Sequence, residues 1–246
     1  MTTTATPGAG KTRRREPWVV TFYRSEVGKK WIMAITGIFL LLYVFAHMLG
    51  NLKVFFGPEE INEYGEALRD LGGHLVPSTH LLWIMRIGLT FTFAVHIVAA
   101  YQLAIRARQT RGPVKYEASR HWVASNYASR TMRWTGTIVL LFLLFHLADL
   151  TWGTPAPPAT TAFERGDVYG NLVASLSRPL VSAIYIAANI ALGFHIFHGA
   201  WSLFQSVGSN NSRYNHSRRT FAWVFTAIIV IGNLSIPIAV LTGIIS

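Results

Sequence analysis

The sequence predicts an all-α integral membrane protein, a bundle of five transmembrane helices. Hydrophobic residues make up 51% of the 246 residues, more than an ordinary soluble domain carries. Five segments are long enough to cross a bilayer, since a helical span needs about 20 mostly apolar residues. Basic and acidic connections alternate between these segments, as loops on opposite sides of a membrane do.

The five segments are read as helices because they are long and apolar on all sides, and a helix satisfies its own backbone in lipid. We expect residues 1–24 to form a disordered basic tail, because the first 17 of them are polar, basic and rich in Thr, Gly and Pro. Residues 25–246 would form a single membrane domain. Its predicted spans are residues 31–54, 80–105, 132–152, 179–207 and 220–245.

The loop charges predict the direction of the helices. Basic residues precede the first span and fill the second and fourth connections, whereas the first and third connections have few basic residues and hold most of the acidic ones. By the positive-inside rule, the N-terminus is cytoplasmic and the C-terminus lies outside the cell membrane. This explanation accounts for the net charge of +11 without a nucleic-acid partner. A short surface helix is expected in the first outer connection, beginning at Pro58.

Histidines occur inside four of the five predicted spans. His47 and His146 come late in the two outward-running spans, so both lie in the outer half of the membrane. His96, His195 and His198 come late in the two inward-running spans, so they lie in the inner half. Two imidazoles at one depth on different helices are what bis-histidine haem requires. The alternative is that each histidine is a hydrogen-bonded packing residue, and the depth argument leaves His195 and His198 equally eligible.

Two glycines support a second level of ligation. Gly37 and Gly136 each precede an outer histidine by ten residues. At 1.5 Å per residue this is about 15 Å nearer the inside. At that depth the two helices that carry no inner ligand present a surface without side chains, past which an inner macrocycle would lie. Small residues also serve plain helix packing, which is the alternative explanation. The chain contains no cysteine, so it cannot supply thiolate ligands itself.

Two stretches carry a resemblance to a known family. "SEVGKKWIMAITGIFLLLYVFAHMLGNL" (residues 25–52) and "FHIFHGAWSLFQSVG" (residues 194–208) resemble the cytochrome b membrane-anchor subunit of succinate dehydrogenase and fumarate reductase. The closest type is the single-subunit, five-helix, dihaem form. The resemblance extends from about residue 25 to the end of the chain.

The resemblance implies a set of ligands. Two haem b groups are expected, one held by His47 and His146 and the other by His96 and a histidine of the fourth helix. In the family the fourth ligand is followed by glycine, which favours His198 and leaves His195 as the alternative.

The resemblance also implies a role and partners. The chain would anchor an iron–sulfur subunit and a flavoprotein at the cytoplasmic face, and exchange electrons with menaquinone or ubiquinone. Succinate would react on the flavoprotein and not on this chain. The basic loop around Tyr116, Trp122 and Tyr127 is a candidate docking surface, with a solvated loop as the alternative. A further small membrane subunit is also possible.

Several charged residues are candidates for quinone, proton or propionate contacts. Arg86 and Asp149 lie within spans, where charges pair or face a cavity. They could pair with each other, or Arg86 could meet a haem propionate while Asp149 exchanges protons with an outer quinone. Glu66 in the first outer loop is a weaker proton carrier. Arg130 and Arg133 could meet inner propionates or serve as anchors at the inner face.

Three alternative functions stay open at this stage. One is a haem b anchor of another respiratory dehydrogenase, such as a formate dehydrogenase or a hydrogenase. Another is a histidine-containing transporter without redox chemistry. The third keeps the respiratory role, with fewer haems or with a metal centre completed by another chain's cysteines.

Overall fold

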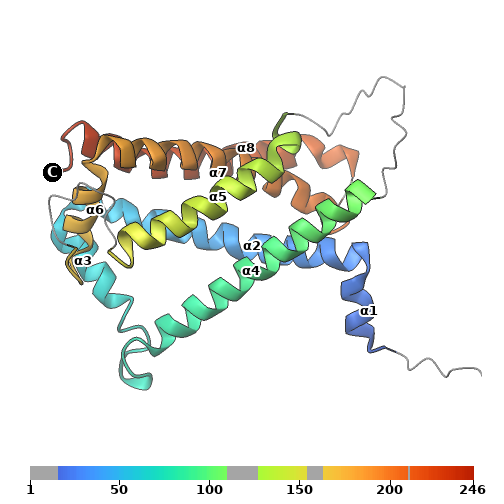
Figure 1. Ribbon diagram of the computed structural model, residues 1–246, viewed down its shortest axis with the longest axis horizontal. Coiled ribbons are helices and arrows are strands. Elements are labelled where there is room, and N and C mark those ends of the chain that lie inside the picture. Colours follow the sequence, from blue (N-terminus) through green and yellow to red (C-terminus); the bar gives the residue numbers. More distant parts are fainter. Residues whose placement is uncertain (1–15, 110–126, 154–162, 210) are drawn as a thin grey trace, which may run out of the picture.

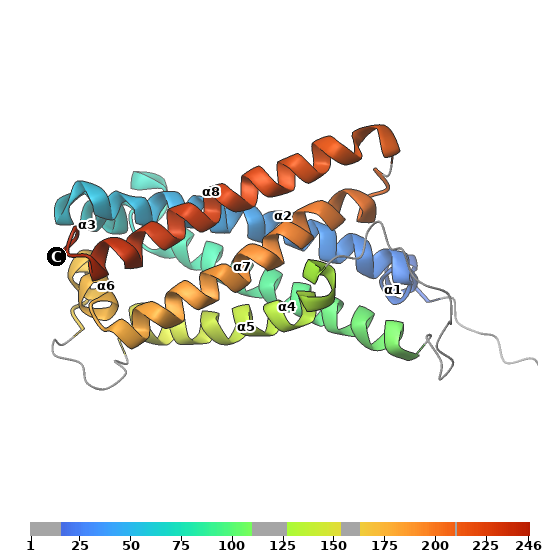
Figure 2. The same ribbon diagram turned by 90° about the horizontal axis from the view of Figure 1, so that it is seen from above.

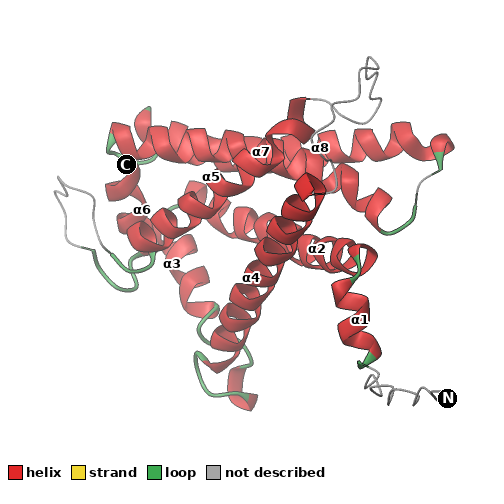
Figure 3. Ribbon diagram, turned by 45° about the vertical axis from the view of Figure 1, so that its right-hand side comes forward, coloured by secondary structure: helices red, strands yellow, loops and turns green. Residues whose placement is uncertain are grey.

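The computed structural model describes residues 16–109, 127–153, 163–209 and 211–246, and all regular structure within these ranges is helical (Figure 3). Its α-helices are α1 (Trp18–Arg24), α2 (Glu26–Asn51), α3 (Pro58–Ala67), α4 (His80–Gln109), α5 (Tyr127–Leu150), α6 (Val168–Leu176), α7 (Pro179–Ser206) and α8 (Asn215–Leu241). Short 3₁₀ helices are η1 (Leu52–Phe56), η2 (Gly73–Leu75) and η3 (Ser212–Tyr214).

The five predicted spans are confirmed. The structure has five helical segments that are long and apolar enough to cross a membrane. Four of them extend beyond the predicted bounds at one or both ends. The segments are Glu26–Phe56, His80–Gln109, Thr131–Leu150, Pro179–Ser206 and Ser212–Leu241.

The long helices associate mainly as two pairs with a fifth helix at one side. Helix α2 packs along α4, and α5 packs along α7, while α8 covers α7 (Figure 1). Contacts of α2 with α7 and α8 join the two pairs. Among the described residues, no extended backbone contact joins α4 to α5 or α7, nor α2 to α5. The two pairs therefore face each other with little direct helix packing between them.

Burial is distributed unevenly over the spans. The largest cluster of buried apolar residues lies where α7 and α8 meet α6, α3 and η1, and a smaller one, with Met48, Ile196 and Ile229, lies where α2, α7 and α8 meet. Of the most apolar 18-residue window, 44% of the residues are buried in α7 but 0% in α4. Helix α4 therefore presents most of its apolar surface to something other than the described side chains.

Two short helices close one end of the bundle, opposite the end that carries α1 (Figure 2). Asn62 of α3 joins them, because its Oδ1 accepts from the backbone N–H groups of Val168 (2.8 Å) and Tyr169 (3.0 Å). Its Nδ2 donates to Asp167 Oδ1 at 3.2 Å, and Asp167 caps α6 by accepting from the Gly170 N–H. The surface helix predicted from Pro58 is α3. The sequence analysis did not anticipate α6.

The N-terminal segment is more ordered than expected near the membrane domain. Trp18–Arg24 form α1, although residues up to 24 were expected to be disordered. Tyr23 ties this helix to the bundle, since its hydroxyl donates to Gln102 Oε1 of α4 at 3.3 Å. Lys29 is buried beneath it, with its ammonium group 5.2 Å from the centre of the Tyr23 ring. Residues 1–15 of the predicted tail lie outside the described residues.

Candidate functional site

The two outer histidines meet across the interface between the helix pairs. The ring centres of His47 on α2 and His146 on α5 are 5.9 Å apart, and the ring planes are inclined by 82°. Metal–nitrogen bonds are about 2 Å long, and each ring centre lies about 1 Å behind its nitrogen. Two imidazoles on opposite sides of one iron would therefore have centres about 6 Å apart. The pairing of these two residues, predicted from depth alone, has the separation that shared ligation requires.

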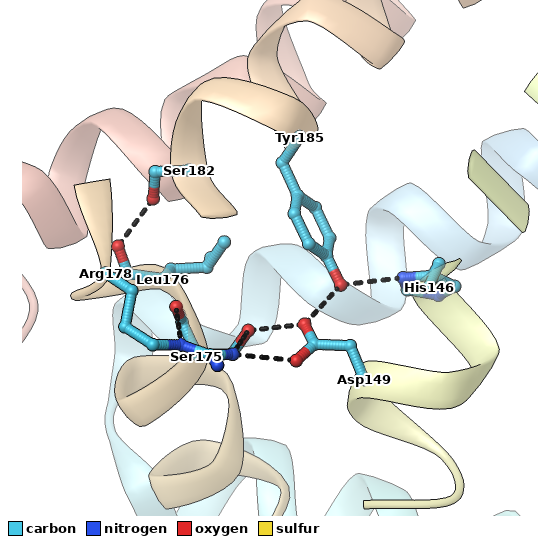
Figure 4. Close-up of polar contacts among 7 residues, drawn as sticks. All are labelled: His146, Asp149, Ser175, Leu176, Arg178, Ser182 and Tyr185. Carbon is cyan, nitrogen blue, oxygen red and sulfur yellow. Dashed lines mark hydrogen bonds and ion pairs between the residues drawn. The ribbon is translucent and has the colours of Figure 1, made fainter. Parts of the chain in front are cut away.

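A buried polar network continues from His146 (Figure 4). Its Nδ1 lies 3.2 Å from the hydroxyl of Tyr185 on α7. That hydroxyl donates to Asp149 Oδ2 at 3.0 Å, and Ser175 Oγ at the end of α6 donates to the same oxygen. Arg178 completes the network, with Nη2 2.8 Å from Asp149 Oδ1. The side chains of Asp149 and Arg178 are only 4% and 17% exposed, so this is a buried ion pair.

The ion pair excludes one of the alternatives left open by the sequence, a pair between Asp149 and Arg86. Asp149 pairs with Arg178, whereas Arg86 is exposed on α4 with its guanidinium over the Trp83 ring at 5.2 Å. The α6–α7 corner brings Arg178 to the end of α5, while α4 makes no extended contact with α5. A signal for Arg178 was present in the sequence. It directly precedes Pro179, which opens a span at the membrane side where the Asp149 span ends.

The inner histidine of α4 lies against a Thr–Gly pair on α2. His96 Nδ1 is 3.1 Å from Thr36 Oγ1. A Cβ atom placed on Gly37 would be 3.5 Å from His96 Cε1, so the ring packs directly on this part of α2. At this distance a methyl group on residue 37 would be in ordinary van der Waals contact with the imidazole.

The same arrangement recurs on α5 and α7. His195 Nδ1 is 3.4 Å from Thr135 Oγ1, and a Cβ atom on Gly136 would be 3.2 Å from His195 Cε1. Thr135, Gly136, His146 and His195 each lie 99 residues after their counterparts on α2 and α4. The sequence analysis missed this repeat, although the constant offset was the signal that could have revealed it.

His195, and not His198, occupies the position equivalent to His96. His198 lies one turn further along α7, and its buried Nδ1 has no hydrogen-bond partner among the described residues. The preference for His198 depended on the glycine that follows it. The contacts with Thr135 and Gly136 favour the alternative, His195.

The remaining candidate residues either lie on exposed surface away from the two histidine pairs or have side chains outside the described part of the chain. Glu66 is exposed near the end of α3. Arg133 is exposed on α5, on the side opposite Thr135, since two residues are separated by about 200° around a helix. The side chain of Arg130 and most of the basic loop with Tyr116 and Trp122 lie outside what the structure describes. The side chain of Tyr127, which opens α5, is likewise not described.

The donor sets suit a metal that brings most of its own ligands. Within the described ranges, no three His, Cys, Asp or Glu side chains converge on one point. An ion held by either histidine pair would need its other ligands from another group, and a haem macrocycle supplies four nitrogens in a plane. The outer pair, His47 and His146, comes from helices of different pairs, which make few backbone contacts with each other. The described residues therefore fit haem.

Comparison with known families decides the classification. The family model of the succinate dehydrogenase/fumarate reductase transmembrane subunit matches residues 114–234. The chain belongs to this family. The matched range holds α5, α6, α7 and most of α8, and with them one histidine of each pair and the buried ion pair. This chain of the succinate dehydrogenase/fumarate reductase family is a multi-pass integral membrane protein and a membrane subunit of such a complex. Searches of curated proteins and of solved structures gave no match.

Proposed function

We propose that the chain is the membrane anchor and electron-transfer subunit of a succinate:quinone oxidoreductase that binds two haem b groups. His47 and His146 would hold the outer haem, and His96 and His195 the inner one. The observation that carries this proposal is the 5.9 Å separation of the His47 and His146 rings. The repeated Thr–Gly–His contact at the second level supports it.

The residues of the chain would orient the group and exclude water from it. When bound, haem iron supplies reversible one-electron chemistry. Gly136 leaves room for the imidazole of His195, since a Cβ atom there would be 3.2 Å from its Cε1, and the helix pairs would shield both levels from solvent. Along α2 and α5 the two levels are about 15 Å apart. Electrons could therefore pass from one side of the membrane to the other within this chain.

Orientation and partners follow from the loop charges. The N-terminal end would be cytoplasmic, because the basic connections lie at that end. The iron–sulfur subunit and the flavoprotein would dock there, and the flavoprotein would carry the succinate site. A further small membrane subunit would cover exposed surface such as that of α4. Menaquinone or ubiquinone would be the electron acceptor within the membrane.

The structure favours different roles for the charged candidates. Asp149 makes contacts with Arg178, Ser175 and Tyr185 that are typical of a structural carboxylate. Arg86 stays the candidate for a contact with an outer propionate, and Glu66 for proton exchange near an outer quinone. Arg130 and Arg133 stay candidates for the inner face.

The test is a dithionite-reduced minus oxidised visible spectrum of the purified complex, together with identification of its subunits. Two b-type haems and the flavoprotein and iron–sulfur partners are expected. His47→Ala and His195→Ala should each remove one haem, whereas His198→Ala should leave both. His198 is the matched control, since it lies one turn from His195 on the same helix.

Other outcomes would contradict the proposal in distinguishable ways. A wild-type complex without haem would favour a transporter. Iron with acid-labile sulfide in place of haem would favour a centre completed by another chain's cysteines. Haem together with different partner subunits would assign the chain to another respiratory dehydrogenase.

A further inference from the structure

We infer that the hydroxyl groups of Thr36, Thr135 and Tyr185 fix three ligand imidazoles in the tautomer that carries hydrogen on Nδ1 and offers Nε2 to iron. The inference rests on the proposed function. It assigns positioning roles to three residues that bind no metal themselves. Its basis is a count of hydroxyl protons, since a hydroxyl donates one hydrogen bond and accepts up to two.

The proton of Thr36 is committed to its own helix. Two backbone carbonyls accept the single proton of Thr36 Oγ1 in a shared hydrogen bond, Ile32 O at 2.7 Å and Met33 O at 3.2 Å, the back-bonding expected of threonine within a helix. Towards His96 the same oxygen can then only accept. The 3.1 Å contact is therefore an Nδ1–H donating to Oγ1, and the lone pair of the His96 ring is on Nε2.

Thr135 repeats this arrangement in the second helix pair. Its one hydroxyl proton is shared between Thr131 O at 3.2 Å and Met132 O at 3.1 Å. The 3.4 Å contact with His195 Nδ1 is longer than that of Thr36, but it has the same polarity. Thr36 and Thr135, 99 positions apart, thus hold the two inner imidazoles in the same tautomer.

The Tyr185 hydroxyl accepts a hydrogen bond from His146, as the threonine hydroxyls do from the inner ligands. Its own proton, however, is donated to a stronger acceptor than a backbone carbonyl. Its proton goes to Asp149 Oδ2 at 3.0 Å, and an ionised carboxylate can only accept. Arg178 Nη2 pairs with the other oxygen of that carboxylate, Asp149 Oδ1, at 2.8 Å. The Tyr185 oxygen must therefore accept from His146 Nδ1–H across 3.2 Å.

The threonine and tyrosine hydroxyls differ in how strongly they accept the hydrogen bond from the imidazole. A hydrogen bond from the distal nitrogen makes a ligating imidazole more basic, and a more basic ligand stabilises the oxidised metal. A hydroxyl that is polarised by a carboxylate accepts more strongly than one polarised by a neutral carbonyl. Loss of Tyr185 should therefore raise the midpoint potential of the outer haem. Loss of either threonine should raise that of the inner haem by less.

The experiment is a redox titration, followed by visible spectroscopy, of the purified wild-type complex and of three nearly isosteric variants. Tyr185→Phe should shift only the outer component to higher potential. Thr36→Val and Thr135→Val should each shift only the inner component, and Thr36→Ser, which restores a hydroxyl, should return it towards the wild-type value. Tyr101→Phe is the control, because its hydroxyl contacts Thr137 Oγ1 at 2.9 Å and no histidine.

The outcomes separate this inference from the proposed function. A wild-type complex without haem would overturn both. Two haems with unchanged midpoints in all three variants, or a shift of the same component by Tyr185→Phe and Thr36→Val, would overturn the tautomer assignment alone. If Tyr185→Phe fails to assemble, the two threonine variants with the Thr36→Ser rescue decide the question on their own.

Discussion

At the scale of single residues, the buried Asp149–Arg178 pair requires both of its charges to be present. Charges are costly to remove from water, and both partners are almost fully enclosed. Their hydrogen bonds with Ser175 and Tyr185 satisfy further lone pairs and protons of the carboxylate and the guanidinium. Removing one partner would leave the other as an uncompensated charge.

Asp149→Ala should therefore destabilise the protein by about 3–5 kcal/mol, the usual result of breaking a buried ion pair on one side. Thermal unfolding of the detergent-solubilised complex measures the effect. The matched control is Glu60→Ala, which breaks the pair between Lys53 and Glu60 (2.9 Å apart), whose side chains are 38% and 52% exposed. That change should cost no more than about 1 kcal/mol. Equal losses in the two variants would contradict the role given to Asp149.

Sequence reasoning reached the histidines but not their partners. Depth follows from residue number once the direction of a span is known, so the pairing of His47 with His146 could be predicted. Arg86 and Arg178 both lie near the outer ends of their spans, and depth cannot distinguish them. The α6–α7 corner decides between them, and nothing in the sequence analysis indicated that α6 would form.

At the scale of helices, glycines set how closely α8 approaches α7 and α2. A Cβ atom on Gly193 would lie 2.6 Å from Val230 Cγ2 of α8, so the two backbones are packed more tightly than alanine permits. Gly232 of α8 similarly abuts Met48 of α2. Close packing at small residues is a main source of helix association in lipid.

Gly193→Ala should force α7 and α8 apart and cost about 1–3 kcal/mol, as overpacking of a core does. Gly88→Ala on α4 is the matched control, because a Cβ atom there would meet nothing within 4 Å. Thermal unfolding of both variants in the same detergent tests the difference. A Gly193→Ala protein as stable as the Gly88→Ala protein would show that the contact between α7 and α8 relaxes freely.

The positions of the spans could be predicted, but their neighbours could not. Length and hydropathy locate a span, whereas a helix that is apolar on all sides has no face that identifies its partner. Helix α4 illustrates this limit, since its sequence is as apolar as that of α7 while its surroundings are entirely different. Only the 99-residue offset contained information on pairing, because it relates α2 and α4 to α5 and α7.

At the scale of the whole molecule, the direction of insertion is still a prediction. The chain has no cysteine, so an introduced cysteine is the only thiol in it. Glu63→Cys on α3 and Ser212→Cys before α8 replace exposed residues in the first and fourth connections. In intact cells a membrane-impermeant thiol reagent should label Glu63→Cys and not Ser212→Cys. The opposite labelling pattern would invert the topology and place partner docking at the other end of the bundle.

Helix α4 is held along one flank by α2, and its apolar window is otherwise bare. If the proposed haems are what holds α4 on its other side, this chain would reach the bilayer with that helix unsecured in a cell short of porphyrin. Quality-control proteases that recognise loosely held segments would then degrade it before the catalytic subunits arrive. Porphyrin supply would in this way set the abundance of the whole respiratory complex.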